Sequence, residues 1–106
     1  MQANFLYEVT LTRDDVNQPW GFSMAGGRQV FRHLYVSKIL RGTAAEGKLE
    51  PGEVVVGING YDVRTSTLLD ATSVVKHAGY QLVLILDRRD MNKVVVLHTP
   101  EGPSSW

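Results

Sequence analysis

The chain begins with an alternation of hydrophobic and polar positions, which is typical of a strand with one buried face. Short apolar runs bounded by turn residues then recur along it, and this is typical of further strands. Pro51-Gly52 and Asn59-Gly60 are the clearest of the turn signals. The pattern predicts strands at residues 5–12, 22–25, 34–40, 54–58, 61–63 and 81–87, with an extra strand at 93–98.

One longer segment has a helical period instead. Ser66 or Thr67 can cap its start, and Gly79 is a natural C-terminal stop. A helix with two apolar stripes is either deeply buried or lines a groove. The stripe expected to meet the core comprises Ala71, Val74 and Ala78, and the second stripe comprises Leu68, Thr72 and Val75.

The segment GTAAEGKL, residues 42–49, is open to two interpretations. Thr43 and Glu46 have the spacing of a capping box, which predicts a short helix here. The same residues have the G-x-x-x-x-G-K spacing of a phosphate-binding loop, but Leu49 stands where that loop requires Ser or Thr. A nucleotide-binding domain that uses Gly42 to Lys48 is therefore an alternative, and binding of ATP with magnesium would distinguish it.

Composition and charge then exclude several classes of protein. A chain of 106 residues with 43% hydrophobic residues has the size and composition of one globular domain. We expect this domain at 1–90 and a Pro-, Gly- and Ser-rich extension at 91–106. Eleven basic residues balance eleven acidic ones, which argues against nucleic acid as a partner. The absence of cysteine fits a reducing, cytoplasmic location.

The sequence contains no catalytic constellation. His33, His77 and His98 are too scattered to form a metal-binding pair, and Ser23 is not in a G-x-S-x-G elbow. Asp14 and Asp15 are adjacent, a spacing that suits a solvated loop rather than an acid–base pair. We therefore expect no enzyme activity, no metal and no cofactor.

The stretch NQPWGFSMAGG, residues 17–27, is the most unusual part of the sequence. Gly21 lies between Trp20 and Phe22, directly before a predicted strand. In such a turn the consecutive N–H groups of these three residues can converge on an anion, with the aromatic rings beside it. An anion next to an apolar side chain describes the free C-terminus of a peptide. The structural alternative is a hydrophobic turn that fills the core.

The order of these blocks resembles a PDZ domain. PWGF resembles the carboxylate-binding loop of that family, residues 34–63 resemble the central strands and turns, and residues 66–79 resemble the second helix. The resemblance covers Leu6 to Arg88, and the joint order is more specific than any single block. The PWGF…GG beginning is similar to PDZ domains of PDZ-LIM proteins. The resemblance implies a mainly β fold, a five- to six-stranded partly open barrel or sandwich capped by one short and one longer α-helix.

The resemblance also implies a function. A C-terminal peptide would add as a strand between the second strand and the second helix, in a scaffold or adaptor protein of the cytoplasm, at the cytoskeleton or at membrane-associated scaffolds. Its carboxylate would bind the amides of Trp20, Gly21 and Phe22. Membranes would be reached only indirectly, through partners. The peptide-binding residues would be Ser23, Met24, Ala25, Ser37, Leu68, Thr72 and Val75.

Three positions depart from the family pattern. Leu68 stands where many members have a histidine that accepts a bond from a ligand Ser or Thr, so we expect an apolar ligand residue third from the end and an apolar last residue. Asp15 replaces the usual basic residue before the loop, and Arg13 is a nearby substitute. Glu53 replaces the usual Asp after Pro-Gly, and we expect no consequence from this change.

Some alternatives stay open within the same family. The fold can also bind internal peptide motifs or lipid head groups, or it can mediate dimerisation. Arg28, Arg32 and Lys38 either favour acidic residues upstream in a ligand or form an ordinary solvated face. The tail ends in Trp106, a large apolar residue with a free carboxylate, and self-association through it is a further hypothesis.

Overall fold

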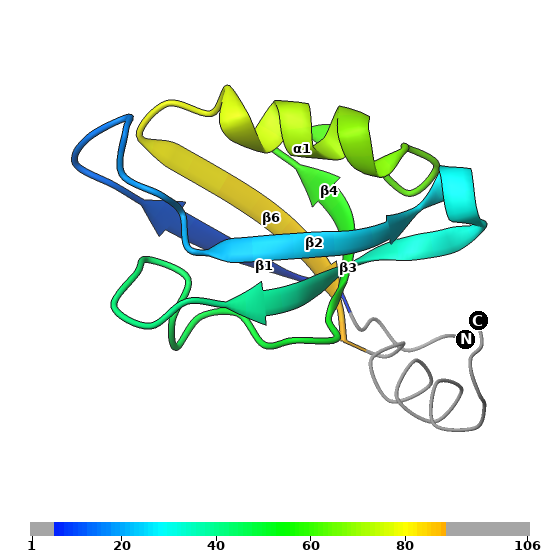
Figure 1. Cartoon of the computed structure of the whole chain (residues 1–106), viewed down its shortest axis with the longest axis horizontal. Coiled ribbons are helices and arrows are strands. Elements are labelled where there is room, and N and C mark those ends of the chain that lie inside the picture. Colours follow the sequence, from blue (N-terminus) through cyan, green and yellow to red (C-terminus); the bar gives the residue numbers. More distant parts are fainter. Residues whose placement is uncertain (1–5, 89–106) are drawn as a thin grey trace.

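Antiparallel strands make up most of the fold, and one α-helix lies across them (Figure 1). The computed structural model describes residues 6–88, so the predicted strand at 93–98, the extension 91–106 and Trp106 lie outside the described residues. In chain order, the elements are β1 (Leu6–Thr12), β2 (Phe22–Gly27), the 3-10 helix η1 (Arg28–Val30), β3 (Arg32–Ile39), β4 (Val54–Ile58), β5 (Tyr61–Asp62), α1 (Leu68–Lys76) and β6 (Gln81–Asp87).

The strands form one six-stranded sheet in the order β1-β6-β4-β3-β2, with β5 paired to β4. Every pair in the described part of the chain is antiparallel. The prediction of a mainly β fold is confirmed, with an open sheet rather than a closed barrel. Because β2 stands at one end of the strand order, one of its edges is not paired with another strand of the sheet.

The turn chemistry read from the sequence is confirmed at the β4–β5 hairpin. Asn59 has φ 47° and Gly60 has φ 86°, and the flanking residues Ile58 and Tyr61 pair directly. A two-residue turn with both central φ angles positive matches the twist of its strands, which is why Asn-Gly is favoured there. β4 and β6 also have the predicted bounds.

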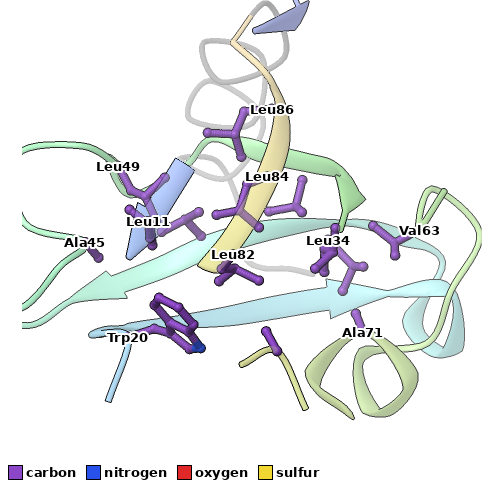
Figure 2. Close-up of a cluster of buried hydrophobic side chains, with 14 residues drawn as sticks. Leu11, Trp20, Leu34, Ala45, Leu49, Val63, Ala71, Leu82, Leu84 and Leu86 are labelled. Atoms are coloured by element: carbon purple, nitrogen blue, oxygen red, sulfur yellow. The ribbon is translucent and has the colours of Figure 1, made fainter. Parts of the chain in front are cut away.

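The hydrophobic core lies between the sheet and α1 (Figure 2). In β1 the predicted alternation holds, because Leu11 is buried whereas Leu6, Glu8 and Thr12 are exposed. From β6, alternate residues are fully buried, and Ala71 of α1 meets the same cluster. The most completely buried leucines are Leu11, Leu34, Leu82, Leu84 and Leu86.

A buried carboxylate sits at the edge of this core. Glu53 is fully buried, and its Oε1 accepts a hydrogen bond of 2.8 Å from the N–H of Glu50. Its Oε2 accepts from Arg88 Nη2 at 2.9 Å and from Arg88 Nε at 3.2 Å. A fully buried carboxylate needs such partners, so Glu53 has a structural role that the sequence pattern did not indicate.

The two predicted helices have different outcomes. The side chain of Thr67 caps α1 by accepting from the N–H of Asp70 at 3.1 Å, but the helix ends at Lys76, before Gly79. The short helix predicted between Thr43 and Gly47 is absent, and residues 42–49 form successive turns. Among residues 6–88 no helix is long and apolar enough to cross a membrane.

The capping box at the short segment was also wrong. The hydroxyl of Thr43 donates to the carbonyl of Leu40 at 2.7 Å, and the carboxylate of Glu46 accepts from Gly42 N–H at 2.7 Å. Gly42 and Gly47 adopt positive φ angles of 75° and 82°, which a right-handed helix does not contain, so no continuous helix runs through this segment. The preceding strand, β3, is antiparallel to its neighbours, so this segment does not have the geometry of a phosphate-binding loop after a parallel strand.

Candidate functional site

The loop of Trp20 to Phe22 is held by its carbonyl groups. Trp20 C=O accepts from Ala45 N–H at 3.2 Å, and Gly21 C=O accepts from Leu40 N–H at 2.8 Å. Within residues 6–88 no acceptor lies in hydrogen-bonding range of the N–H groups of Trp20 and Gly21, although both residues are buried. Buried backbone donors normally have a partner, so these groups are available to an anion.

Gly21 is required at its position for two structural reasons. Its φ of 96° is rarely adopted by residues with a side chain. A Cβ atom at this position would also overlap the side chain of Thr43, which packs directly against the loop. The glycine therefore lets the loop lie against the turn at 42–49. This contact fixes the position of the N–H groups of the loop.

Arg13 supports the loop from the other side. Its guanidinium donates to the carbonyls of Gln18 at 2.8 Å, Ala78 at 2.6 Å and Gly79 at 2.8 Å. It also lies 4.2 Å from the centre of the Trp20 ring, a cation–π distance. Arg13 therefore joins the loop to the end of α1, and most of its donors are used for structure.

Trp20 itself belongs to the core. Its side chain is 5% exposed and packs among the buried leucines (Figure 2), and no hydrogen-bond acceptor within residues 6–88 meets its Nε1. A ring buried to this extent offers a ligand little surface, so the contribution of Trp20 that fits the structure is its backbone N–H.

Strand β2 and helix α1 lie side by side, with the start of α1 next to the end of β2 (Figure 1). Both elements contribute half-buried side chains that pack against the core, which leaves part of each side chain accessible. The unpaired edge of β2 runs along the same region. The accessible residues that the structure brings together are Phe22, Met24 and Ala25 from β2 and Leu68, Thr72 and Val75 from α1.

The two predicted serine contacts lie on adjoining strands. Ser23 is exposed and pairs with Lys38 of β3. The register shifts after this pair, because Met24 pairs with Val36 and leaves Ser37 as an extra residue in a bulge. A bulge re-aims the side chains around it, so the place of Ser37 relative to a ligand depends on this irregularity.

The other end of β2 is tied to the helix by Gln29. Its Nε2 donates to Gly26 C=O at 2.7 Å, and its Oε1 accepts from Leu68 N–H at 3.0 Å. The N–H of Arg28 also donates to Ser66 C=O at 3.0 Å. These bonds, called the Gln29 bridge below, fix the distance between β2 and the start of α1. Sequence reading missed the bridge because no motif marks a glutamine that spans 39 positions of the chain.

An ion pair lies in the loop before α1. Arg64 Nη2 lies 2.8 Å from Asp62 Oδ2, and Arg64 Nε donates to Asp62 Oδ1 at 3.0 Å. These hydrogen bonds lower the pKa of Asp62 from 3.8 to about 2. Both side chains are largely exposed, so the pair orders the loop more than it stabilises the fold.

These features define a class of protein. A family model described as PDZ domain matches residues 8–86, so this chain belongs to the PDZ family, a class of protein-interaction modules. The prediction of that family from the sequence is confirmed. A solved PDZ domain, the second of Dlg1 from the choanoflagellate Monosiga brevicollis, has the same fold with a TM-score of 0.71. It is 24% identical and covers 77% of this chain and 97% of its own.

The relatives include proteins named for PDZ and LIM domains. LIM domain-binding protein 3 of Mus musculus is 40% identical over 77% of this chain, and PDZ and LIM domain protein 3 of Rattus norvegicus is 38% identical over 68%. The Drosophila melanogaster protein Zasp, a PDZ and LIM domain protein, is 37% identical over 78%. The matched part covers 11%, 20% and 4% of these relatives, respectively.

Proposed function

We propose that this module captures the C-terminal peptides of partner proteins by β-strand addition. The ligand would lie antiparallel to β2, in the region between β2 and α1, and its carboxylate would accept from the N–H groups of Trp20, Gly21 and Phe22. The observation that carries the proposal is an unpaired edge of β2, which begins next to the N–H groups of Trp20 and Gly21, neither of which has a hydrogen-bond partner within residues 6–88. Main-chain hydrogen bonds along the edge would supply affinity, and side-chain pockets would supply selectivity.

Half-buried apolar side chains of β2 and α1 would form the contact surface for the last side chain of the ligand. Phe22, Met24 and Val75 contact the core on one side and leave apolar surface on the other. An apolar last residue would cover this surface and gain about 25 cal/mol per Å² of apolar area removed from water. Ser23 and Ser37 would lie beside upstream ligand residues. In a longer protein, such a module would act as a scaffold or adaptor in the cytoplasm, including at the cytoskeleton.

The carboxylate separates this proposal from the other uses of the fold. We expect a peptide with an apolar last residue to bind with roughly micromolar affinity, about −8 kcal/mol, because ordering a flexible strand offsets much of its contact energy. Amidation of the same peptide should weaken binding at least about tenfold, since a charged acceptor for buried N–H groups is lost. Isothermal calorimetry of the acid and the amide makes this comparison.

Equal affinities of acid and amide would overturn the proposal. They would favour an internal motif that adds to β2 without a terminal carboxylate. A variant outside the site provides the control, because Lys48→Gln changes an exposed charge on the turn at 42–49 and should leave both affinities unchanged.

A further inference from the structure

A positively charged hollow lies where η1 meets the loop before α1. It has a volume of ≈ 270 Å³, and no Asp or Glu lines it, although the whole chain has no net charge. Positive charge is therefore concentrated locally. The residues that line this basic hollow are Arg28, Phe31, Arg32, His33, Arg64 and Thr65.

The arginines of the basic hollow differ in their present partners. Arg64 is engaged by Asp62 in the two-bond ion pair described above. The guanidinium of Arg32 lies 5.5 Å from the centre of the Tyr35 ring. Arg28 is exposed and has no ion-pair partner within residues 6–88. A guanidinium that is exposed and unmatched by a carboxylate is suited to bind phosphate groups through parallel N–H donors.

Phe31 beside the arginines is unusual in two independent respects. Its side chain is 95% exposed, although large aromatic side chains are normally at least partly buried. Its φ of 57° and ψ of 40° place it in the left-handed region, where a bulky residue is strained. The loop thus holds an apolar ring out in water at a conformational cost. Strain of this kind collects at functional sites.

We propose that the basic hollow and Phe31 together bind the surface of an anionic membrane. Arg28 would contact the phosphate and carboxylate groups of the lipids, and the Phe31 ring would enter the boundary between head groups and acyl chains. This contact is direct, in contrast to the indirect membrane association expected from the sequence. It goes beyond peptide capture, because none of the residues of the basic hollow is among the peptide-binding residues proposed on β2 and α1.

The exposure of Phe31 favours a lipid surface over an acidic peptide. Side chains that line a peptide-binding site are normally held in place by packing against their neighbours. The Phe31 ring, in contrast, is 95% exposed, and little else contacts it. A fluid interface can surround such a ring on all sides. Attraction of the arginines to anionic lipids adds to this insertion, and each charge near the surface contributes separately.

Co-sedimentation with lipid vesicles tests the proposal. We expect the 106-residue chain to bind vesicles that contain phosphatidylserine more tightly than vesicles of phosphatidylcholine alone. Arg28→Gln should weaken binding about fivefold, and Phe31→Asn by a similar factor. Matched controls are Arg41→Gln and Val16→Asn, which make the same changes at exposed positions outside the basic hollow. Neither control should change vesicle binding.

The thermal stability of Phe31→Asn makes the test independent of folding. Asparagine tolerates the left-handed region. The melting temperature of the Phe31→Asn variant should therefore stay the same or rise while its vesicle binding falls. A lower melting temperature would mean that Phe31 serves the fold, and would overturn the proposal. Equal binding to both vesicle types, or equal losses in the control variants, would overturn it as well. If Arg28→Gln instead weakens only a soluble peptide with acidic upstream residues, the basic hollow belongs to the peptide site.

Discussion

At the scale of single residues, the start of α1 would decide which ligand side chains the proposed peptide site selects. Leu68 is half-buried and packs against the core, so in the proposed complex it would present an apolar surface to the ligand residue third from the end. A ligand Ser or Thr buried there would lose a hydrogen bond worth about 1 kcal/mol. We therefore predict a preference for an apolar residue at this ligand position.

The substitution Leu68→His should reverse that preference toward Ser or Thr, because an imidazole nitrogen can accept the hydroxyl proton. Paired peptides that differ only at this position, titrated against both proteins, measure the change. Leu69→His is the matched control, since Leu69 is 78% exposed and should leave selectivity unaltered. If the original chain already prefers Ser or Thr, then Thr72 is the candidate acceptor, and Thr72→Ala should abolish the preference.

At the scale of elements, the Gln29 bridge joins β2 and α1 at one end, as Arg13 joins the loop and α1 at the other. Gln29 spans two elements with a single side chain, so its loss removes both side-chain bonds and leaves only the backbone bond from Arg28 to Ser66. We expect Gln29→Ala to lower the free energy of unfolding by about 1 kcal/mol and to weaken peptide binding. Urea unfolding and peptide titration measure the two effects.

Two further variants make this prediction specific. Gln29→Glu keeps an acceptor for Leu68 N–H near the positive end of the helix dipole, but it loses the donor to Gly26 C=O. The free energy of unfolding and the peptide affinity of Gln29→Glu should therefore lie between those of the original chain and those of Gln29→Ala. Gln81→Ala removes an exposed glutamine from β6 and should affect neither measurement. Unchanged stability and affinity in Gln29→Ala would show that the bridge does not position the groove.

At the scale of the whole molecule, the last described residue stabilises the fold through a buried charge. Arg88 binds Glu53, donates to the Tyr7 hydroxyl at 2.8 Å and lies 4.5 Å from the centre of the Tyr7 ring. It thus connects the end of β6 with β1 and with the turn before β4. Arg88→Met would leave the fully buried Glu53 carboxylate without its cation.

We expect Arg88→Met to lower the free energy of unfolding by about 2 kcal/mol, because the fully buried Glu53 carboxylate loses its cation, although the Arg88 side chain itself is 54% exposed. Urea unfolding at neutral pH measures this loss. Glu53→Gln in the same chain should restore part of it by removing the charge. Arg64→Met breaks the exposed pair with Asp62 and should change stability little. Similar losses in Arg88→Met and Arg64→Met would contradict the importance of burial here.

The elements that could be predicted from the sequence are those whose causes lie within a few neighbouring residues. β4 and β6 were predicted with their observed bounds, because each is a short apolar run between turn residues. The Asn59-Gly60 turn was predicted because two positive φ angles depend on two neighbouring residues. The helix at Thr43 was wrong, since the same hydroxyl that can cap a helix bonds here to the carbonyl of Leu40. The order of the blocks was enough to identify the family.

The sequence by itself determined the strands, the capped start of α1 and the glycine between two aromatic residues. It could not determine what those residues meet. The free edge of β2, the burial of Trp20 and the contact of Gly21 with Thr43 all depend on segments that are distant in the chain. The Gln29 bridge and the Glu53–Arg88 pair span 39 and 35 positions, respectively. Local propensities act over a few residues, whereas such contacts are chosen only when the sheet and the helix pack together.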